Sequence, residues 1–108
     1  MPKVMVMEDK DVIMNQYYEE GYIVTALIGV KVDTKRINDF TSAVVDLNTV
    51  EDIFLVTGEY DIILKVKFPS YRELKDFIIN KLSKIDGVIK TETMMVINIY
   101  KERGIKFE

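Results

Sequence analysis

The chain has 108 residues, enough for one domain with a single modest core. It contains no histidine and no cysteine, which excludes disulfides, thiolate chemistry, the usual zinc ligands and the usual general base near pH 7. Its formal net charge of −3, without a basic stripe, makes it a poor candidate for contacting nucleic acid directly. It has neither a run of roughly 20 apolar residues for a membrane span nor the layout of a signal peptide, so we expect a cytoplasmic protein without a membrane partner.

The first segment, residues 1–21, has no clear pattern. Val4 and Val6 suit a short strand, whereas Ile13 and Tyr17 suit one or two helical turns. Four of the six methionines lie here, and methionine often covers a surface that belongs to a partner. We treat this segment as an N-terminal extension of undefined structure.

A regular pattern begins at residue 22. Residues 22–33 are rich in β-branched side chains that alternate between two faces, which predicts a strand. Asp33 or Thr34 can cap the helix that follows. The apolar stripe of that helix recurs at three- and four-residue spacing, at Ile37, Phe40, Val44 and Leu47. Residues 48–49 end the helix.

Two strands and a corner come next. Residues 50–57 and 60–68 are apolar runs on either side of a short polar break, the pattern of a tight strand–turn–strand connection. Gly58 can adopt a positive φ at the corner, and Pro69 stops the second strand. Geometry alone explains most such corners, so the corner by itself does not indicate a binding site.

The second helix is marked at both ends. Ser70 and Glu73 form a capping box at its start, and Gly87 ends it by accepting the left-handed conformation. Residues 88–100 form the last predicted strand, and residues 101–108 a charged C-terminal tail.

The element order is therefore strand, helix, strand, strand, helix, strand. With right-handed crossovers it predicts an α+β, ferredoxin-like βαββαβ fold, in which two helices cover one face of a four-stranded antiparallel sheet. The first and last strands carry apolar residues on both faces, whereas a solvated sheet face alternates more cleanly. We therefore expect the second face to pack on a symmetric copy, which gives a dimeric αβ-sandwich.

Few residues suit catalysis. Glu59 and Asp61 are carboxylates two positions apart, which suits a general acid and base or a bound cation. The chain offers no histidine to complete either site, and turns favour both residue types anyway. The basic pairs at residues 35–36 and at 101 and 103 are better explained as solvated charges than as phosphate ligands. We predict no catalytic residue, no metal ion and no cofactor.

A binding site for a small zwitterion is the stronger candidate. Thr91 and Thr93 point to one face of the last strand, with their hydroxyls about 7 Å apart. These hydroxyls and the backbone N–H groups of the corner can bind a carboxylate, while Asp61 can pair with an ammonium group.

The same residues resemble a known family. The run TGEYDIILKV at 57–66, followed about thirty residues later by GVIKTET at 87–93, is similar to the effector-binding domain of the Lrp/AsnC regulators, also called the RAM domain. The resemblance covers roughly residues 21–100, and we take residues 22–100 as the effector-binding and oligomerisation domain. It implies a dimer formed through the sheets, often assembled into octamers or similar rings, that binds an amino acid in a cleft between dimers. The matching effector-binding positions are Gly58, Tyr60, Asp61, Thr91 and Thr93, with Glu59 at the same corner.

One part of the family pattern is not found. The regulators carry an N-terminal helix-turn-helix domain, and residues 1–21 are too few for its three helices. We therefore expect a stand-alone effector-binding and oligomerisation module, linked to regulation of amino acid metabolism or transcription without direct DNA binding, that can co-assemble with a full-length regulator. Two alternatives stay open: a dimeric ferredoxin-like enzyme that uses Tyr60, Asp61 or Glu59, and a purely structural adaptor for a full-length regulator.

Overall fold

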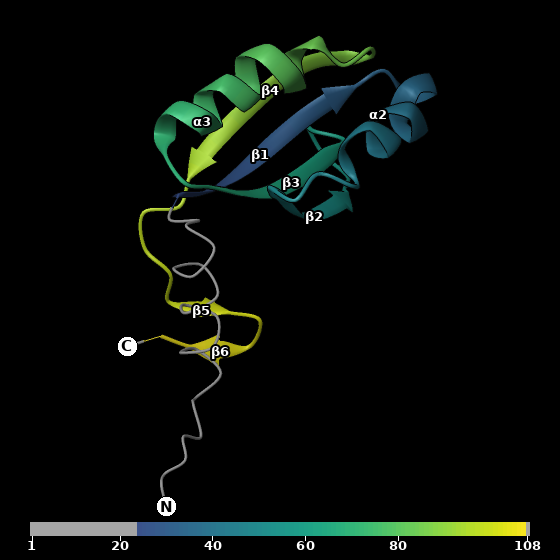
Figure 1. Cartoon of the computed structure of the whole chain (residues 1–108). Helices are drawn as coiled ribbons and strands as arrows, with labels where there is room; N and C mark the ends of the chain where they lie inside the picture. The colour runs from purple at the N-terminus through teal and green to yellow at the C-terminus, as the bar shows by residue number, and fades with distance from the viewer. Residues whose placement is uncertain (1–23, 108) are drawn as a thin grey trace, which may run out of the picture.

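A computed structural model describes residues 24–107 (Figure 1). The predicted extension over residues 1–21 lies outside this range. The elements, in chain order, are β1 (Val24–Val32), η1 (Thr34–Arg36), α2 (Ile37–Val44), β2 (Val50–Leu55), β3 (Ile62–Phe68), α3 (Tyr71–Asp76), η2 (Phe77–Lys81), η3 (Leu82–Lys84), β4 (Val88–Met95), β5 (Lys101–Glu102) and β6 (Ile105–Lys106).

The main sheet has four strands in the order β2-β3-β1-β4, and every neighbouring pair is antiparallel. Helix α2 and the helical stretch from α3 to η3 lie on one side of this sheet (Figure 1). The predicted α+β, ferredoxin-like fold is confirmed. Among the described residues, no helix is both long and apolar enough to cross a membrane.

The core lies between the helices and the sheet. The side chains of β1 that face the helices are at most 6% exposed: Val24, Ala26, Ile28, Val30 and Val32. They pack against buried residues of the helical layer, Phe40, Val44, Leu74, Phe77 and Leu82. Full burial of one such side chain contributes roughly 1.5–3 kcal/mol before the entropy cost of ordering it. The predicted alternation of β1 therefore sets which face of the sheet carries the helices.

The side chains that cap the helices are those expected from the sequence. Asp33, rather than Thr34, caps the first helical turn: its Oδ1 accepts a hydrogen bond from the Lys35 N–H at 3.0 Å. At the second helix the Ser70 hydroxyl accepts from the Glu73 N–H at 3.3 Å, one half of the predicted capping box. The prediction that Gly87 ends this helix is wrong: η3 ends at Lys84, and Ile85 after it is extended. Gly87 does have a positive φ, +95, but in the turn that leads into β4, where the Val88 N–H donates to the Ile85 carbonyl at 3.2 Å.

The C-terminal part differs from the prediction. Strand β4 ends at Met95 instead of residue 100, and residues 101–106 form a second, two-stranded sheet. The Val96 N–H still donates to the Thr25 carbonyl at 3.0 Å, so β4 ends level with the first described residues of β1. The turn of the small hairpin is Arg103-Gly104, with φ of 52 and 80, and two consecutive positive φ values match the right-handed twist of paired strands.

An ion-pair group attaches the hairpin to the main sheet. Lys65 of β3 pairs with Glu51 at 3.0 Å and with Glu102 of β5. Partial burial by itself lowers the pKa of Lys65, but the hydrogen bonds and charges of the two carboxylates outweigh burial and raise this pKa. The charged tail is thus held to the sheet, on the face opposite the helices.

Candidate functional site

The predicted corner is a tight connection between β2 and β3. The Val56 N–H donates to the Asp61 carbonyl at 2.9 Å and closes the loop. Gly58 has φ +116, which side chains rarely allow, while a Cβ built there would meet nothing within 4 Å. Glycine is therefore required at this position by the backbone conformation and not by a close neighbour.

Asp61 anchors the corner to β1. Its Oδ2 accepts a hydrogen bond from the Val32 N–H at 2.9 Å, and its own N–H donates to the Val30 carbonyl at 3.0 Å. The register between β1 and β4 shifts between Lys31 and Val32, so the carboxylate satisfies a backbone donor where the strand ladder is irregular. Asp61 was predicted to pair with the ammonium group of a ligand. One of its two carboxylate oxygens instead binds the backbone of β1.

The Tyr60 ring lies on Gly29 in the middle of β1. A Cβ built at Gly29 would be 2.9 Å from Cγ of Tyr60 and 3.0 Å from Cδ2. Only glycine leaves room for the ring. Gly29 is not among the positions predicted from the sequence, although a lone glycine inside a β-branched strand is a known sign of close approach by another group.

Two charged side chains of β4 complete this cluster. The Lys90 Nζ lies 5.7 Å from the centre of the Tyr60 ring and 3.4 Å from the Glu59 Oε2. A hydrogen bond with the Glu92 side chain, together with desolvation and the charge of Glu92, raises the pKa of the Tyr60 phenol. We call Glu59, Tyr60, Lys90 and Glu92 the corner cluster.

Within the corner cluster, Tyr60 and Lys90 affect each other's pKa. The negative charge of an ionised Tyr60 and the hydrogen bond and charge of Glu59 raise the pKa of Lys90. The Lys90 and Glu59 side chains are 55% and 69% exposed. An ion pair with this exposure is weakly held, and a ligand can replace either partner at little cost.

The two threonines lie on the other face of the sheet. In the β1–β4 register Thr91 is opposite Val30 and Thr93 is opposite Ile28, and both of those side chains are fully buried under the helices. Paired residues of an antiparallel sheet share a face. Thr91 and Thr93 therefore face the helical layer, whereas Glu92, opposite Gly29, lies on the face with Tyr60.

One chain thus gathers part of the predicted site. The corner residues are brought together with Lys90 and Glu92, which sequence analysis missed although they flank Thr91. The hydroxyls of Thr91 and Thr93 are not brought to the face of the sheet that carries the corner cluster. Because the resemblance places the amino acid cleft between dimers, one chain need not contain all of its walls. Among residues 24–107 no group of three or more acidic side chains is placed to hold a metal ion.

Comparison with known proteins gives consistent relatives. Residues 25–105 match the model of the Lrp/AsnC ligand binding domain. The chain is 37% identical over 105 residues to an uncharacterized HTH-type transcriptional regulator of Pyrococcus horikoshii, covering 93% of this chain and 70% of that protein. It is 33% identical over 84 residues to another from Pyrococcus furiosus, covering 78% of this chain and 57% of that protein. The chain thus spans little more than half the length of the latter regulator.

Solved structures agree with the fold. Escherichia coli AsnC superimposes with a TM-score of 0.73 at 30% identity, over 80% of this chain and 58% of AsnC. The protein FFRP-DM1 superimposes with a TM-score of 0.67 at 29% identity, over 69% of this chain and all of that one. The two curated relatives carry the name of HTH-type transcriptional regulators, and the matching family model is a ligand-binding domain, so the expectation that the chain is not an enzyme is confirmed by its family. The chain belongs to the Lrp/AsnC ligand-binding domain family.

Proposed function

We propose that the chain is a non-catalytic module that binds an amino acid at the corner cluster. The observation that carries this proposal is the accessible grouping of opposite charges around one aromatic ring, on a corner with the residue pattern of the family. An α-amino acid carries an ammonium and a carboxylate on the same carbon. The carboxylates of Glu59 and Glu92 and the face of Tyr60 suit the ammonium, and Lys90 suits the carboxylate.

The six predicted effector-binding positions have different parts in this proposal. Gly58 and Asp61 shape the corner, while Glu59 and Tyr60 contact the ligand. Thr91 and Thr93 face the helical layer, so in this proposal they contact a ligand only where it is held by the corner cluster of another copy of the chain. Assembly is therefore part of the proposal.

We infer that assembly begins with a homodimer formed through the open face, the face of the main sheet opposite α2 and α3. Leu27, Phe54 and Met94 lie on this face by their register and are 36%, 55% and 45% exposed. Apolar side chains gathered on one sheet face are typical of a contact surface. Further association of dimers into a ring, and co-assembly with a full-length Lrp/AsnC-type regulator, complete the proposal.

The proposed setting is regulation of amino acid metabolism or transcription in the cytoplasm. The net charge of −3 supports a role for this chain without direct contact to nucleic acid. Signals would then reach DNA through the regulator with which the module co-assembles.

The test is a thermal-shift panel of the twenty common amino acids. Methionine is one of the first to try, because a Neisseria meningitidis regulator of the same fold, 19% identical, was solved as a complex with L-Met. A ligand at 100 times its dissociation constant adds about 2.7 kcal/mol to the free energy of unfolding. We expect one or a few amino acids to shift the melting temperature, and Lys90→Gln to remove the shift, whereas the exposed control Lys84→Gln keeps it. If no amino acid shifts the wild type while the oligomer persists, the structural adaptor is the better account.

A further inference from the structure

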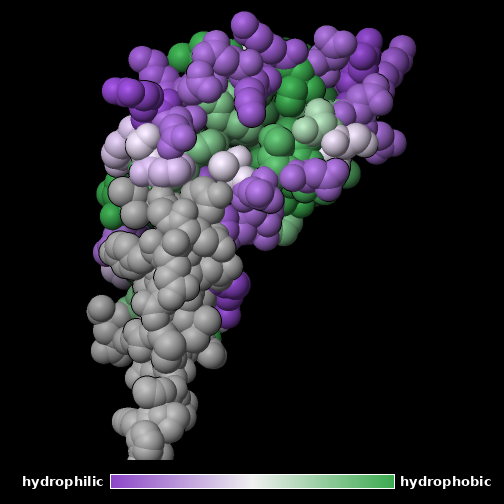
Figure 2. All heavy atoms as spheres, viewed as in Figure 1, coloured by the Kyte–Doolittle hydropathy of each residue, from purple (hydrophilic) through white to green (hydrophobic). Residues whose placement is uncertain are grey.

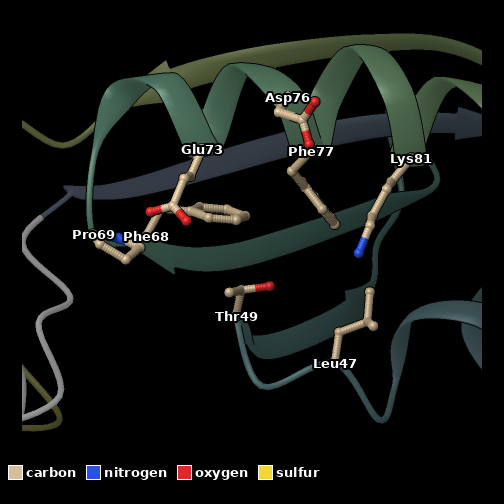
Figure 3. A pocket seen from close by; sticks show the side chains of 8 residues that line it. All are labelled: Leu47, Thr49, Phe68, Pro69, Glu73, Asp76, Phe77 and Lys81. Atoms are coloured by element: carbon tan, nitrogen blue, oxygen red, sulfur yellow. The ribbon is translucent and has the colours of Figure 1, made fainter.

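A concave site lies on the helical side of the sheet. It is a groove of about 290 Å³ between the α3–η2 helix and the chain around the start of β2 (Figure 3). Its lining includes Leu47, Thr49, Phe68, Glu73, Phe77 and Lys81. The corner cluster is at the other end of the β2–β3 pair and on the other face, so the two sites are separate.

The floor of the groove is apolar and aromatic. Phe68 of β3 and Phe77 of η2 stack at 45° with ring centres 5.2 Å apart, and both are nearly buried. Leu47 closes the opposite wall and is partly buried against the same core. Figure 2 shows hydrophobic surface, in green, between hydrophilic side chains above and below it. A floor of this kind suits one aliphatic or aromatic side chain of a ligand.

Two opposite charges stand over this floor. The side chains of Glu73 and Lys81 both descend from the helix, Glu73 near Pro69 and Lys81 toward Leu47 (Figure 3). They are eight residues apart, which is roughly 12 Å along a helical axis. Within residues 24–107 neither carries an ion-pair partner, whereas Asp76 between them accepts a hydrogen bond from Asn80 at 2.6 Å.

We propose that this groove binds a short hydrophobic peptide of about three residues through both of its free ends. The peptide ammonium pairs with Glu73, its carboxylate pairs with Lys81, and its central side chain lies on Phe68 and Phe77. An extended tripeptide spans about 10 Å, comparable to the rise of roughly 12 Å between positions 73 and 81 on an ideal α-helix. A single amino acid carries both charges on one carbon and cannot reach both. A fatty acid offers nothing to Glu73, and a polyamine offers nothing to Lys81.

The volume and the exposure agree with this ligand. A groove of about 290 Å³ is at the small end of ligand pockets, so it accommodates the central side chain of the peptide while both ends lie at its rim. Glu73 and Lys81 are exposed, so binding at each end is a modest, salt-sensitive contact.

The experiment is a calorimetric titration of the full chain with Leu-Phe-Leu, and with the same peptide acetylated at its N-terminus and amidated at its C-terminus. We expect Glu73→Gln and Lys81→Gln each to weaken binding of the free peptide by about 3- to 5-fold. The control Lys84→Gln, an exposed lysine outside the groove lining, leaves it unchanged. Glu73→Gln keeps the helix cap, because that bond uses the backbone N–H of residue 73.

A third peptide, acetylated at its N-terminus but with a free carboxylate, tests the contact with Glu73. It should bind the wild type as weakly as the free peptide binds Glu73→Gln. It should bind Glu73→Gln no more weakly than the free peptide does. Equal binding of the free and blocked peptides, no binding of either, or equal effects of Lys81→Gln and Lys84→Gln would overturn the proposal. Loss of peptide binding in Lys90→Gln would place the peptide at the corner cluster instead, and would also overturn it. Free leucine binding as tightly as the peptide would identify a single amino acid as the occupant.

Discussion

Tyr60 packs directly on Gly29, with no space between ring and strand for even one methyl group. A Cβ at residue 29 would lie 2.9 Å from Tyr60 Cγ, closer than such atoms approach in real structures. Gly29 and Tyr60 are 31 positions apart in the chain, and this contact joins the centre of β1 to the corner. The position of the Tyr60 ring, and with it the geometry of the corner cluster, depends on residue 29 having no side chain.

Gly29→Ala should therefore destabilise the protein by about 1–3 kcal/mol, because the new methyl group overpacks the contact. Denaturant unfolding measures the loss. Tyr60→Ala removes the ring, so adding it to Gly29→Ala should recover part of the stability. Additive effects of the two substitutions would contradict a direct clash.

The Tyr60 phenol should titrate above its ordinary pKa of about 10. Because folding raises this pKa, the protonated phenol stabilises the fold below the unfolded value, and that contribution is lost as the pH rises through the folded value. The ultraviolet absorbance of phenolate, measured as wild type minus Tyr60→Phe, isolates this group. Glu92→Gln should lower the pKa of Tyr60. An unchanged titration would show that Glu92 does not hold the phenol.

Lys65→Met should loosen the β5–β6 hairpin. The change leaves Glu51 and Glu102 facing each other without their shared cation, and it removes the contact that attaches the hairpin to β3. Trypsin should then cleave faster after Lys101 and Arg103. Lys31→Met, at an exposed lysine on β1, is the control and should leave cleavage in the hairpin unchanged. Equal rates in the two variants would contradict the attachment.

Lys65 also predicts a pH dependence. Its pKa is raised on folding, so its contribution to stability is complete below the ordinary lysine pKa of about 10.4 and falls as the pH rises through the folded value. The difference in unfolding free energy between wild type and Lys65→Met should shrink above that pH. A difference that stays constant into strong alkali would argue against a charged contact.

The proposed dimer can be tested with two residues of equal exposure. Phe54, on the open face, is 55% exposed, and Val45, at the end of α2, is 54% exposed. Phe54→Ser should shift the molecular mass measured by light scattering toward the monomer, while Val45→Ser leaves it unchanged. The opposite pattern would place the contact on the helical side.

The sequence predicted the fold well because its signals are local. The two-residue period of β1 and the Asp33 and Ser70 caps each act within a few residues, and the structure has each of them. The Arg103-Gly104 turn was also local, but it was hidden among charged residues and was missed.

The site was predicted in part because its contacts are distant in sequence. The corner was found from its composition, whereas Gly29, Lys90 and Glu92 join it only through the register of the sheet. The pattern showed that Thr91 and Thr93 share a face. It could not show which face, since the last strand is apolar on both.

The hydrogen bond that the Val32 N–H donates to Asp61 has a consequence for how this part of the fold opens locally. Val32 precedes Asp33, the cap of the first helix, and the Asp33 N–H donates to the Gly87 carbonyl at 2.8 Å. The corner, the helix start and the beginning of β4 are thus joined through two consecutive backbone amides. In amide hydrogen exchange these three regions should behave as one cooperative unit, with the Val32 amide protected for as long as the corner stays closed.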